Sequence, residues 1–245
     1  MIMTAQENET AEKSGKKPVV RLEGVGKAFG PLTIFENITF SLFPGEFAFL
    51  VGPSGSGKTT LLRLIYRELL PSTGEIFLDE EKISAKISGR KLCEIRRKIG
   101  RAFQDLKIIQ DRTAWENLML AFQILGKNEK EAKSEMEEIF SLVGLEERMT
   151  LFPSQLSEGE KQRLGIARAL VGEPEILLID EPTSNLDPAN TWQIMKLLDE
   201  INQKGIAILL STHDEDLVNS LQKRVIEIGE KKLLRDEKKG GYASK

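Results

Sequence analysis

The chain has 245 residues, of which 40% are hydrophobic and 30% charged, and its formal net charge is −3. These values are ordinary for a soluble globular protein with a sizeable core. The charge lacks the positive excess of nucleic-acid-binding domains, so no nucleic-acid partner is expected. A single cysteine, Cys93, excludes an internal disulfide framework and agrees with a reducing compartment. No stretch reaches the ~18–20 apolar residues that span a bilayer, so a membrane partner would have to recruit the chain from the cytoplasm.

Differences in polarity and charge along the sequence divide the chain into three parts. Residues 1–17 are polar and mixed in charge, which predicts a disordered leader without the apolar core of a signal peptide. Residues 18–235 predict one α/β domain, and residues 236–245 predict a polar tail. The basic residues near the C-terminus favour a solvated segment, and weak attraction to anionic lipid headgroups is the alternative.

The first elements of the domain are expected to be short strands. They span residues 19–23, 33–35, 38–42, 47–51 and 75–78. Between the last two strands, apolar residues recur at helical spacing from Leu61 to Leu69, and Pro71 and Gly74 end this helix.

The connection between strand 47–51 and that helix has the pattern G-x-x-x-x-G-K-[ST]. Its residues are Gly52, Pro53, Ser54, Gly55, Ser56, Gly57, Lys58 and Thr59. Glycines let backbone N–H groups approach phosphate, Lys58 places a cation on the β- and γ-phosphates, and the Thr59 hydroxyl can bind Mg²⁺. The helix that follows presents its positive N-terminus to the same anion. We therefore predict a nucleoside triphosphate site, with an ordinary glycine-rich turn as the alternative.

The second half of the domain begins with helices and ends with buried strands. Residues 104–160 predict a helical subdomain, and a further helix follows Glu158. The continuous apolar runs at 176–179 and 206–210 are typical of parallel strands that are covered on both faces. Alternation of strands and helices predicts an α/β fold with a mainly parallel sheet.

Charged residues follow both of these strands. Asp180 and Glu181 end the first strand, at the sheet edge where α/β proteins bind ligands. Asp180 can hold Mg²⁺, and Glu181 can accept a proton from an attacking water. His213, the chain's only histidine, follows the second strand and could contact the γ-phosphate and orient water or base. A surface turn and an ordinary surface histidine are the respective alternatives.

The most specific motif of the sequence lies at the expected start of the helix that follows Glu158. Ser157, Glu158, Gly159 and Glu160 lie in the run Leu-Ser-Glu-Gly-Glu-Lys-Gln-Arg, and Ser157 with Glu160 forms a capping box. The run resembles the signature motif of the ATP-binding-cassette (ABC) ATPases, usually Leu-Ser-Gly-Gly-Gln. That resemblance, which covers residues 19–242, implies a P-loop fold with a RecA-like core, an antiparallel β portion and a helical subdomain.

The resemblance also implies roles for further residues. Gln104 matches the Q-loop, which senses Mg²⁺ and γ-phosphate where a partner docks, and Phe29 matches an aromatic residue that stacks on adenine. A core phenylalanine is the alternative for Phe29. Residues 184–187 match the D-loop at the dimer interface. ATP and Mg²⁺ would bind between the loop of one subunit, Gly52 to Thr60, and Ser157 with Gly159 of a second subunit, in a homodimer that ATP assembles.

Several stretches resemble a bacterial cell-division branch of this family. They span residues 63–68, 103–109, 111–117, 233–237 and 240–242. This branch implies an integral membrane partner with four spanning helices, docked at residues 105–117, and a peripheral location on the inner face of the membrane. The alternatives are an ATPase subunit of a related exporter or lipoprotein-release system, and a nucleotide-dependent switch whose slow hydrolysis resets an assembly.

The signature departs from the family at one position. Glu158 replaces a glycine, so a second carboxylate flanks a helix end that should meet phosphate. We expect Glu158 to slow ATP-driven closure, and Lys161 and Arg163 to offset its charge in part.

Overall fold

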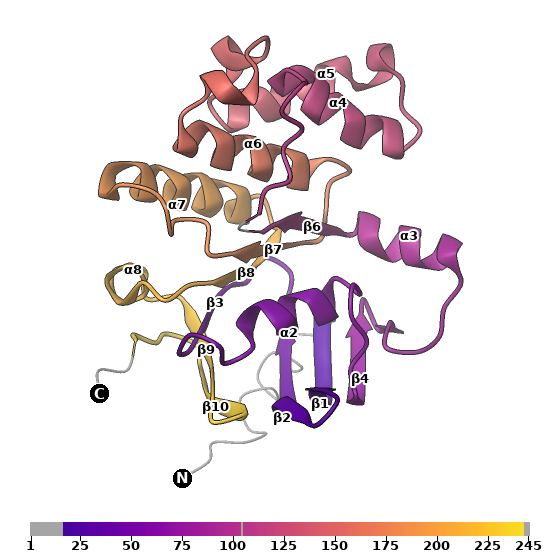
Figure 1. Ribbon diagram of the computed structural model, residues 1–245, viewed down its shortest axis with the longest axis vertical. Helices are drawn as coiled ribbons and strands as arrows, with labels where there is room; N and C mark the ends of the chain where they lie inside the picture. Colours follow the sequence, from indigo (N-terminus) through magenta and orange to yellow (C-terminus); the bar gives the residue numbers. More distant parts are fainter. Residues whose placement is uncertain (1–16, 104, 243–245) are drawn as a thin grey trace.

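The computed structural model describes residues 17–103 and 105–242 (Figure 1). Gln104 and all of the expected leader except Lys17 therefore lie outside the described residues. The strands are β1 (Val20–Phe29), β2 (Leu32–Leu42), β3 (Phe47–Val51), β4 (Thr73–Leu78), β5 (Glu81–Lys82), β6 (Ile99–Ala102), β7 (Ile176–Asp180), β8 (Ala207–Ser211), β9 (Arg224–Gly229) and β10 (Lys232–Glu237). The α-helices are α2 (Lys58–Ile65), α3 (Gly89–Arg97), α4 (Ala114–Ile124), α5 (Glu129–Leu142), α6 (Glu158–Leu170), α7 (Pro188–Gln203) and α8 (Glu215–Leu221).

The strands form two sheets. The central sheet has the order β10-β9-β3-β8-β7-β6, and all its neighbours are parallel except β9 and β10. The second sheet, β2-β1-β4-β5, is antiparallel throughout. Every residue of β3, β7 and β8 is buried, because both faces of the central sheet are covered. The predicted α/β fold with a mainly parallel core is confirmed.

Side-chain alternation along β3 divides the core into two clusters. Phe47 and Phe49 point to a cluster that contains buried residues of α4, α5, α6 and α7. Ala48 and Leu50 point to the other, which contains α2 and the antiparallel sheet. Figure 1 shows the same arrangement, with α4 to α7 on one side of the central strands and α2 with β1, β2 and β4 on the other. Helices α2 and α6 thus lie on opposite faces of the central sheet.

Several expected elements differ from those of the structure. The strands predicted at 33–35 and 38–42 form one strand, β2. Helix α2 ends at Ile65 rather than near Leu69, because Arg67 has a left-handed backbone (φ 60°) that cannot continue the helix. Strands β5, β6 and β9 and helices α3, α7 and α8 lie in stretches for which no element is predicted from the sequence.

Two of the C-terminal charged residues, Arg235 and Asp236, pair with β9, whereas the lysines at 231, 232, 238 and 239 are exposed. Strand β10 extends to Glu237, two residues beyond the expected end of the domain at 235. The buried Arg224 guanidinium donates to both Asp236 carboxylate oxygens (2.7 and 2.6 Å) and to Glu46 (2.9 Å). Such cross-strand ion pairs leave no local signal in the sequence, which explains why the expected end of the domain differs from the end of β10.

Across the part of the chain that the structure describes, helices fall short of the length and apolarity needed to cross a bilayer.

Candidate nucleotide site

The predicted phosphate loop connects β3 to α2, and its backbone requires glycine. A Cβ at Gly52 would lie 2.0 Å from the Ile228 carbonyl oxygen, and one at Gly57 would lie 2.7 Å from the Ile34 side chain. Both glycines also have positive φ angles (142° and 99°), which side chains disfavour. The loop therefore wraps tightly and delivers Lys58 as the first residue of α2.

Lys58 points its ammonium back into the loop. Its side chain is buried, and Nζ donates to the carbonyls of Gly52 (2.8 Å) and Pro53 (3.3 Å). Burial lowers the pKa of Lys58, and the Glu181 and Asp180 carboxylates oppose that shift. The Ser56 hydroxyl is buried and has no hydrogen-bond partner among the described residues. A buried cation and a free hydroxyl donor in one loop fit a phosphate ligand.

The oxygen donors for a magnesium ion come from α2 and β7, which pack together. Thr59 is exposed in the first turn of α2 and Thr60 follows it, while Asp180 is buried at the end of β7 and accepts a hydrogen bond from the Ser211 hydroxyl. Hydroxyl and carboxylate oxygens are the donors that Mg²⁺ prefers, so the donor set fits the ion. The role predicted for Gln104 lies outside the described residues.

Glu181 and His213 meet at the ends of adjacent strands. The His213 Nδ1 atom lies 2.6 Å from Glu181 Oε2, and Asp180 pairs with Ser211 in the register of β7 and β8. Glu181 has a left-handed backbone (φ 51°), which costs a non-glycine residue roughly 1 kcal/mol. Its N–H donates to the Ser211 carbonyl (3.1 Å), which helps to hold this conformation. The structure thus brings together Lys58, Asp180, Glu181 and His213.

The signature turn is a capped helix start. Ser157 is the N-cap of α6; its hydroxyl accepts from Glu160 N–H (3.2 Å), while its own N–H donates to the Glu160 carboxylate (2.8 Å). Arg148 also donates to that carboxylate (2.8 Å). Hydrogen bonds from the Ser157 backbone, then from Arg148, lower the pKa of Glu160 from 4.5 to about 2. Glu160 therefore stays ionised and holds the turn in shape.

The turn is joined to the stretch that matches the D-loop. Gly159 is buried, and a Cβ there would lie 2.8 Å from Asn190 Oδ1 in the first turn of α7. Asn190 donates twice to Asp187, from its backbone (2.9 Å) and from its side chain (2.6 Å). The signature turn thus packs closely against the first turn of α7, which Asp187 caps.

Two expectations about surrounding residues have mixed outcomes. Lys161 pairs with the exposed Glu158 carboxylate (2.7 Å), but Arg163 donates to Gln193 instead, so it does not offset Glu158 as expected. The Phe29 side chain is 46% exposed, which excludes the core alternative, and Lys27 Nζ lies 4.7 Å from its ring centroid. The adenine-stacking role of Phe29 stays a prediction.

Sequence reasoning missed two polar partners of the site residues. Ser211 could have been found, because it ends β8 in register with Asp180. Arg148 left no signal, since it lies in a 3₁₀ turn twelve residues from Glu160. Within one chain, the signature turn and Lys58 begin helices on opposite faces of the central sheet, α6 and α2.

The fold and these residues define a P-loop nucleoside triphosphatase of the cassette type. The family profile described as ABC transporter matches residues 35–184, and the chain belongs to this family. It binds and hydrolyses ATP. The resemblance predicted from the signature and the other motifs is confirmed.

Several relatives carry the name cell division ATP-binding protein FtsE. That of Bacillus subtilis (strain 168) is 39% identical over 92% of this chain and 99% of its own length. That of Streptococcus pneumoniae (strain D39) is 43% identical over 86% of this chain and 91% of its own length. That of Escherichia coli (strain K12) is 39% identical over 86% and 96%, respectively.

Solved structures of cassettes share the fold. CbiO1 from Clostridium perfringens, described as part of an ABC transporter complex, superposes with a TM-score of 0.84 at 28% identity, covering 91% of this chain and 89% of that one. The dimeric cassette MJ0796 superposes with a TM-score of 0.81 at 33% identity, covering 91% and 100%. A further MJ0796 dimer, bound to ADP and phosphate, has a TM-score of 0.79 at 34% identity, with the same coverage.

The depressed pKa of Glu160 predicts a pH-dependent contribution to stability. The ionised cap stabilises the fold above the ordinary pKa of 4.5, and this stabilisation is lost as the pH falls toward about 2. We expect Glu160→Gln to lower the free energy of unfolding by about 1 kcal/mol at neutral pH and by progressively less below pH 4.5. Denaturant titration at a series of pH values measures this; Glu146→Gln, at an exposed position, is the control. A pH-independent difference would contradict the assignment.

We expect removal of the Glu158 charge to raise the rate of ATP hydrolysis. The carboxylate is exposed and, among the residues that the structure describes, pairs with Lys161 alone. We therefore expect Glu158→Gly and the size-matched Glu158→Gln to raise steady-state ATPase activity about 2- to 5-fold, an effect that salt should reduce. An unchanged rate together with unchanged ATP-dependent dimerisation would contradict the expectation.

Proposed function

We propose that the chain is the ATP-hydrolysing subunit of a bacterial cell-division complex, docked on an integral membrane partner of the FtsX type at the inner face of the cell membrane. The observation that carries this proposal is the 39–43% identity to FtsE proteins over 84–92% of the chain. In such a complex the ATP cycle would activate cell-wall hydrolases across the membrane rather than move a solute.

The catalytic unit would be a homodimer with two composite sites. The loop Gly52–Thr60 of one subunit holds the triphosphate, and Ser157 and Gly159 of the other subunit close over the γ-phosphate. The position of α6 and α2 on opposite faces of the central sheet supports this arrangement, because one chain cannot supply both halves. The dimeric cassette structures of MJ0796 offer a precedent for the assembly. ATP binding would then close the two subunits around the nucleotide.

Each side chain at the sheet edge would have its own role in ATP hydrolysis. Glu181 takes the proton from the attacking water, and His213, 2.6 Å from its carboxylate, orients that base toward the γ-phosphate. Lys58 and the loop N–H groups stabilise the charge that develops in phosphoryl transfer. Thr59, Asp180 and Gln104 would hold Mg²⁺, which neutralises phosphate charge when bound.

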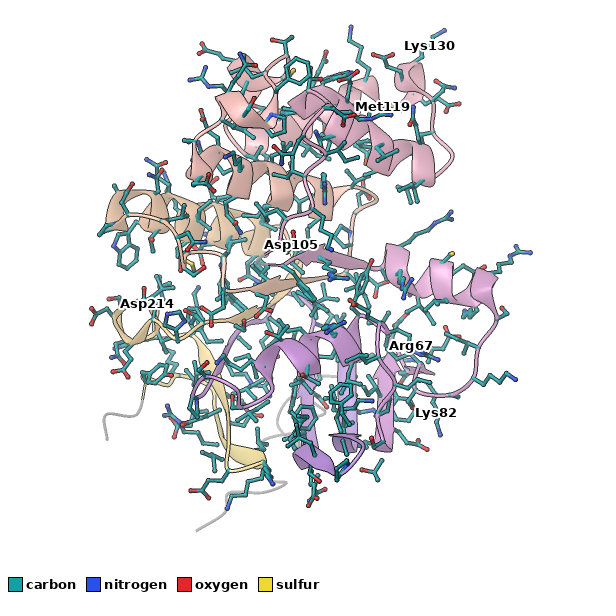
Figure 2. All side chains as sticks on the ribbon, in the orientation of Figure 1. Arg67, Lys82, Asp105, Met119, Lys130 and Asp214 are labelled. Atoms are coloured by element: carbon teal, nitrogen blue, oxygen red, sulfur yellow. The ribbon has the colours of Figure 1, made fainter. Side chains whose placement is uncertain are left out.

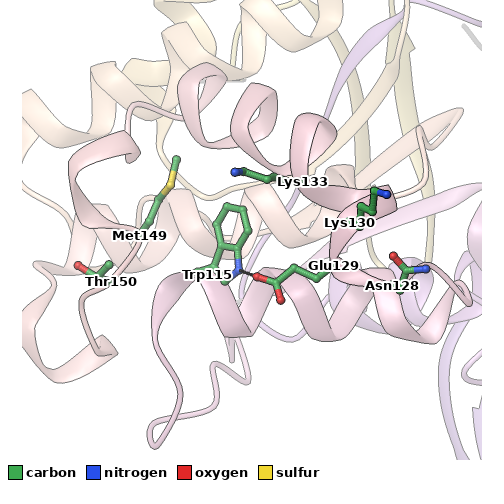
Figure 3. A pocket seen from close by; sticks show the side chains of 7 residues that line it. All are labelled: Trp115, Asn128, Glu129, Lys130, Lys133, Met149 and Thr150. Carbon is green, nitrogen blue, oxygen red and sulfur yellow. Dashed lines mark hydrogen bonds between the residues drawn. The ribbon is translucent and has the colours of Figure 1, made fainter.

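The partner would dock on the stretch that follows β6. Asp105 lies where the chain leaves the sheet for the helices (Figure 2). The buried Asn117 fixes the stretch: its Oδ1 accepts from the Ile109 N–H (2.9 Å), and its Nδ2 lies 3.0 Å from each of the carbonyl oxygens of Ile109, Arg112 and Thr113, which share its two N–H donors. A surface hollow near its end, shown in Figure 3, is lined by Trp115, Asn128, Glu129, Lys130, Lys133, Met149 and Thr150. A prearranged stretch beside a hollow suits the docking of a partner helix.

Removing the base should stop turnover without stopping binding. We expect Glu181→Gln to lower the ATPase rate about 10²- to 10⁴-fold while ATP stays bound, because the amide cannot accept the proton of water. Phosphate release and retention of radiolabelled ATP measure the two effects, with Glu173→Gln at an exposed position as the control. Hydrolysis at the normal rate would show that another residue is the base.

The identity of the membrane partner decides between a division complex and an exporter. We expect the tagged chain, purified from its own cell membranes with ATP and a mild detergent, to bring down a four-span membrane protein of the FtsX type. Mass spectrometry of the co-purified proteins is the measurement, and a sample without ATP is the control. Recovery of a larger permease instead would replace the division role with transport.

A further inference from the structure

The β1–β2 hairpin that carries Phe29 packs against the phosphate loop. Phe29 is the last residue of β1 and pairs with Leu32, the first residue of β2, and both side chains are exposed. Further along β2, the Ile34 side chain lies so close to the loop that a Cβ at Gly57 would be 2.7 Å from it. Figure 1 shows these two strands alongside α2, the helix that Lys58 begins. The exposed ring therefore belongs to a hairpin in direct contact with the nucleotide site.

The Phe29 ring is held from one side by Lys27. The Lys27 ammonium lies over the ring, 4.7 Å from its centroid, where a cation is attracted to the negative face of an aromatic ring. The same ammonium donates a hydrogen bond to the Leu70 carbonyl (2.8 Å). Lys27 is thus fixed between the ring and a backbone acceptor. One face of the ring is covered, while 46% of the Phe29 side chain stays exposed.

The segment that supplies this acceptor is itself anchored to β1. Leu70 lies in the connection between α2 and β4. Two residues further on, the Ser72 N–H donates to the Gly26 carbonyl (2.8 Å), and the Ser72 hydroxyl accepts from the Ala28 N–H (3.0 Å). These two bonds lie on either side of Lys27, which is half-buried. The lysine therefore connects the segment that follows α2 to the aromatic ring of the hairpin.

We propose that Lys27 is a positioning residue for the adenine base of ATP: it holds the Phe29 ring in one orientation and leaves one face of the ring for the base. This inference rests on the proposed stacking of Phe29 on adenine. A ring that is ordered before the ligand arrives loses less side-chain freedom on stacking, which favours binding. The residue acts on the base end of the nucleotide, so it changes affinity more than the rate of the chemical step.

The test is Lys27→Met, which keeps an unbranched side chain and removes both the cation and the hydrogen-bond donor. We expect the Kd for ATP, measured by calorimetry, to rise about 2- to 5-fold, with kcat changed less than about 2-fold. The Kd for inorganic tripolyphosphate should stay the same, because this ligand has no base to stack. Lys27→Arg keeps a cation and N–H donors and should restore the affinity for ATP. Lys86→Met, at an exposed position, is the matched control.

Phe29→Ala separates failure of this inference from failure of the stacking role. We expect Phe29→Ala to weaken ATP binding and to leave Lys27→Met without a further effect in the double variant. Unchanged ATP affinity in Phe29→Ala would overturn the stacking role and the inference with it. Weaker binding in Phe29→Ala beside unchanged affinity in Lys27→Met would overturn the role of Lys27 alone. So would a loss in Lys27→Met that extends to tripolyphosphate or persists in the double variant.

A second variant keeps the proposal testable should Lys27→Met fold poorly. Lys27→Gln places a polar but uncharged amide at this half-buried position, and its melting temperature checks the fold. We expect the Kd for ATP to rise about 2- to 5-fold here too, because the ring attracts a cation far more than a neutral amide. Unchanged affinity in the folded Lys27→Gln chain would contradict the role assigned to the charge.

Discussion

The site depends on the burial of β3, β7 and β8 on both faces of the central sheet. Five-residue strands without an exposed side chain can offer polar groups to a ligand only where they end. The parallel register places those ends at one edge, so Gly52, Asp180 and Ser211 meet although the sequence separates them widely. Glu181 and His213 follow directly from this register. The apolar core therefore positions the charged and polar side chains of the site.

The same sheet separates the phosphate loop from the signature turn, the two parts of the proposed nucleotide site. Helix α2 and the phosphate loop belong to one face, and α6 with the signature turn belongs to the other. On its own face, the turn is rigid: Glu160 and Arg148 hold its cap, and the absence of a Cβ at Gly159 lets Asn190 approach.

The sequence predicted what local patterns encode. The phosphate loop, the Asp180-Glu181 pair and the capping box at Ser157 are each contiguous, and their chemistry follows from spacing alone. Contacts between distant segments were not predictable in this way. The hydrogen bond from Ser211 to Asp180, the ion pair of Arg224 with Asp236 and the hydrogen bond from the Tyr242 N–H to Asn219 join residues that only the folded chain brings together. The same limitation explains why the sequence does not predict the end of β10, since Arg235 and Asp236 pair with Glu227 and Arg224 of β9.

The central claim is that two chains share each ATP site, and the solution mass of the chain tests it most directly. Light scattering on a Glu181→Gln chain should give the mass of one chain without nucleotide and of two chains with ATP. Adding Ser157→Arg should return the mass to that of one chain in ATP while binding of ATP persists, because the signature turn then blocks closure. A mass that ATP does not double, or a doubling that survives Ser157→Arg, would contradict the shared site.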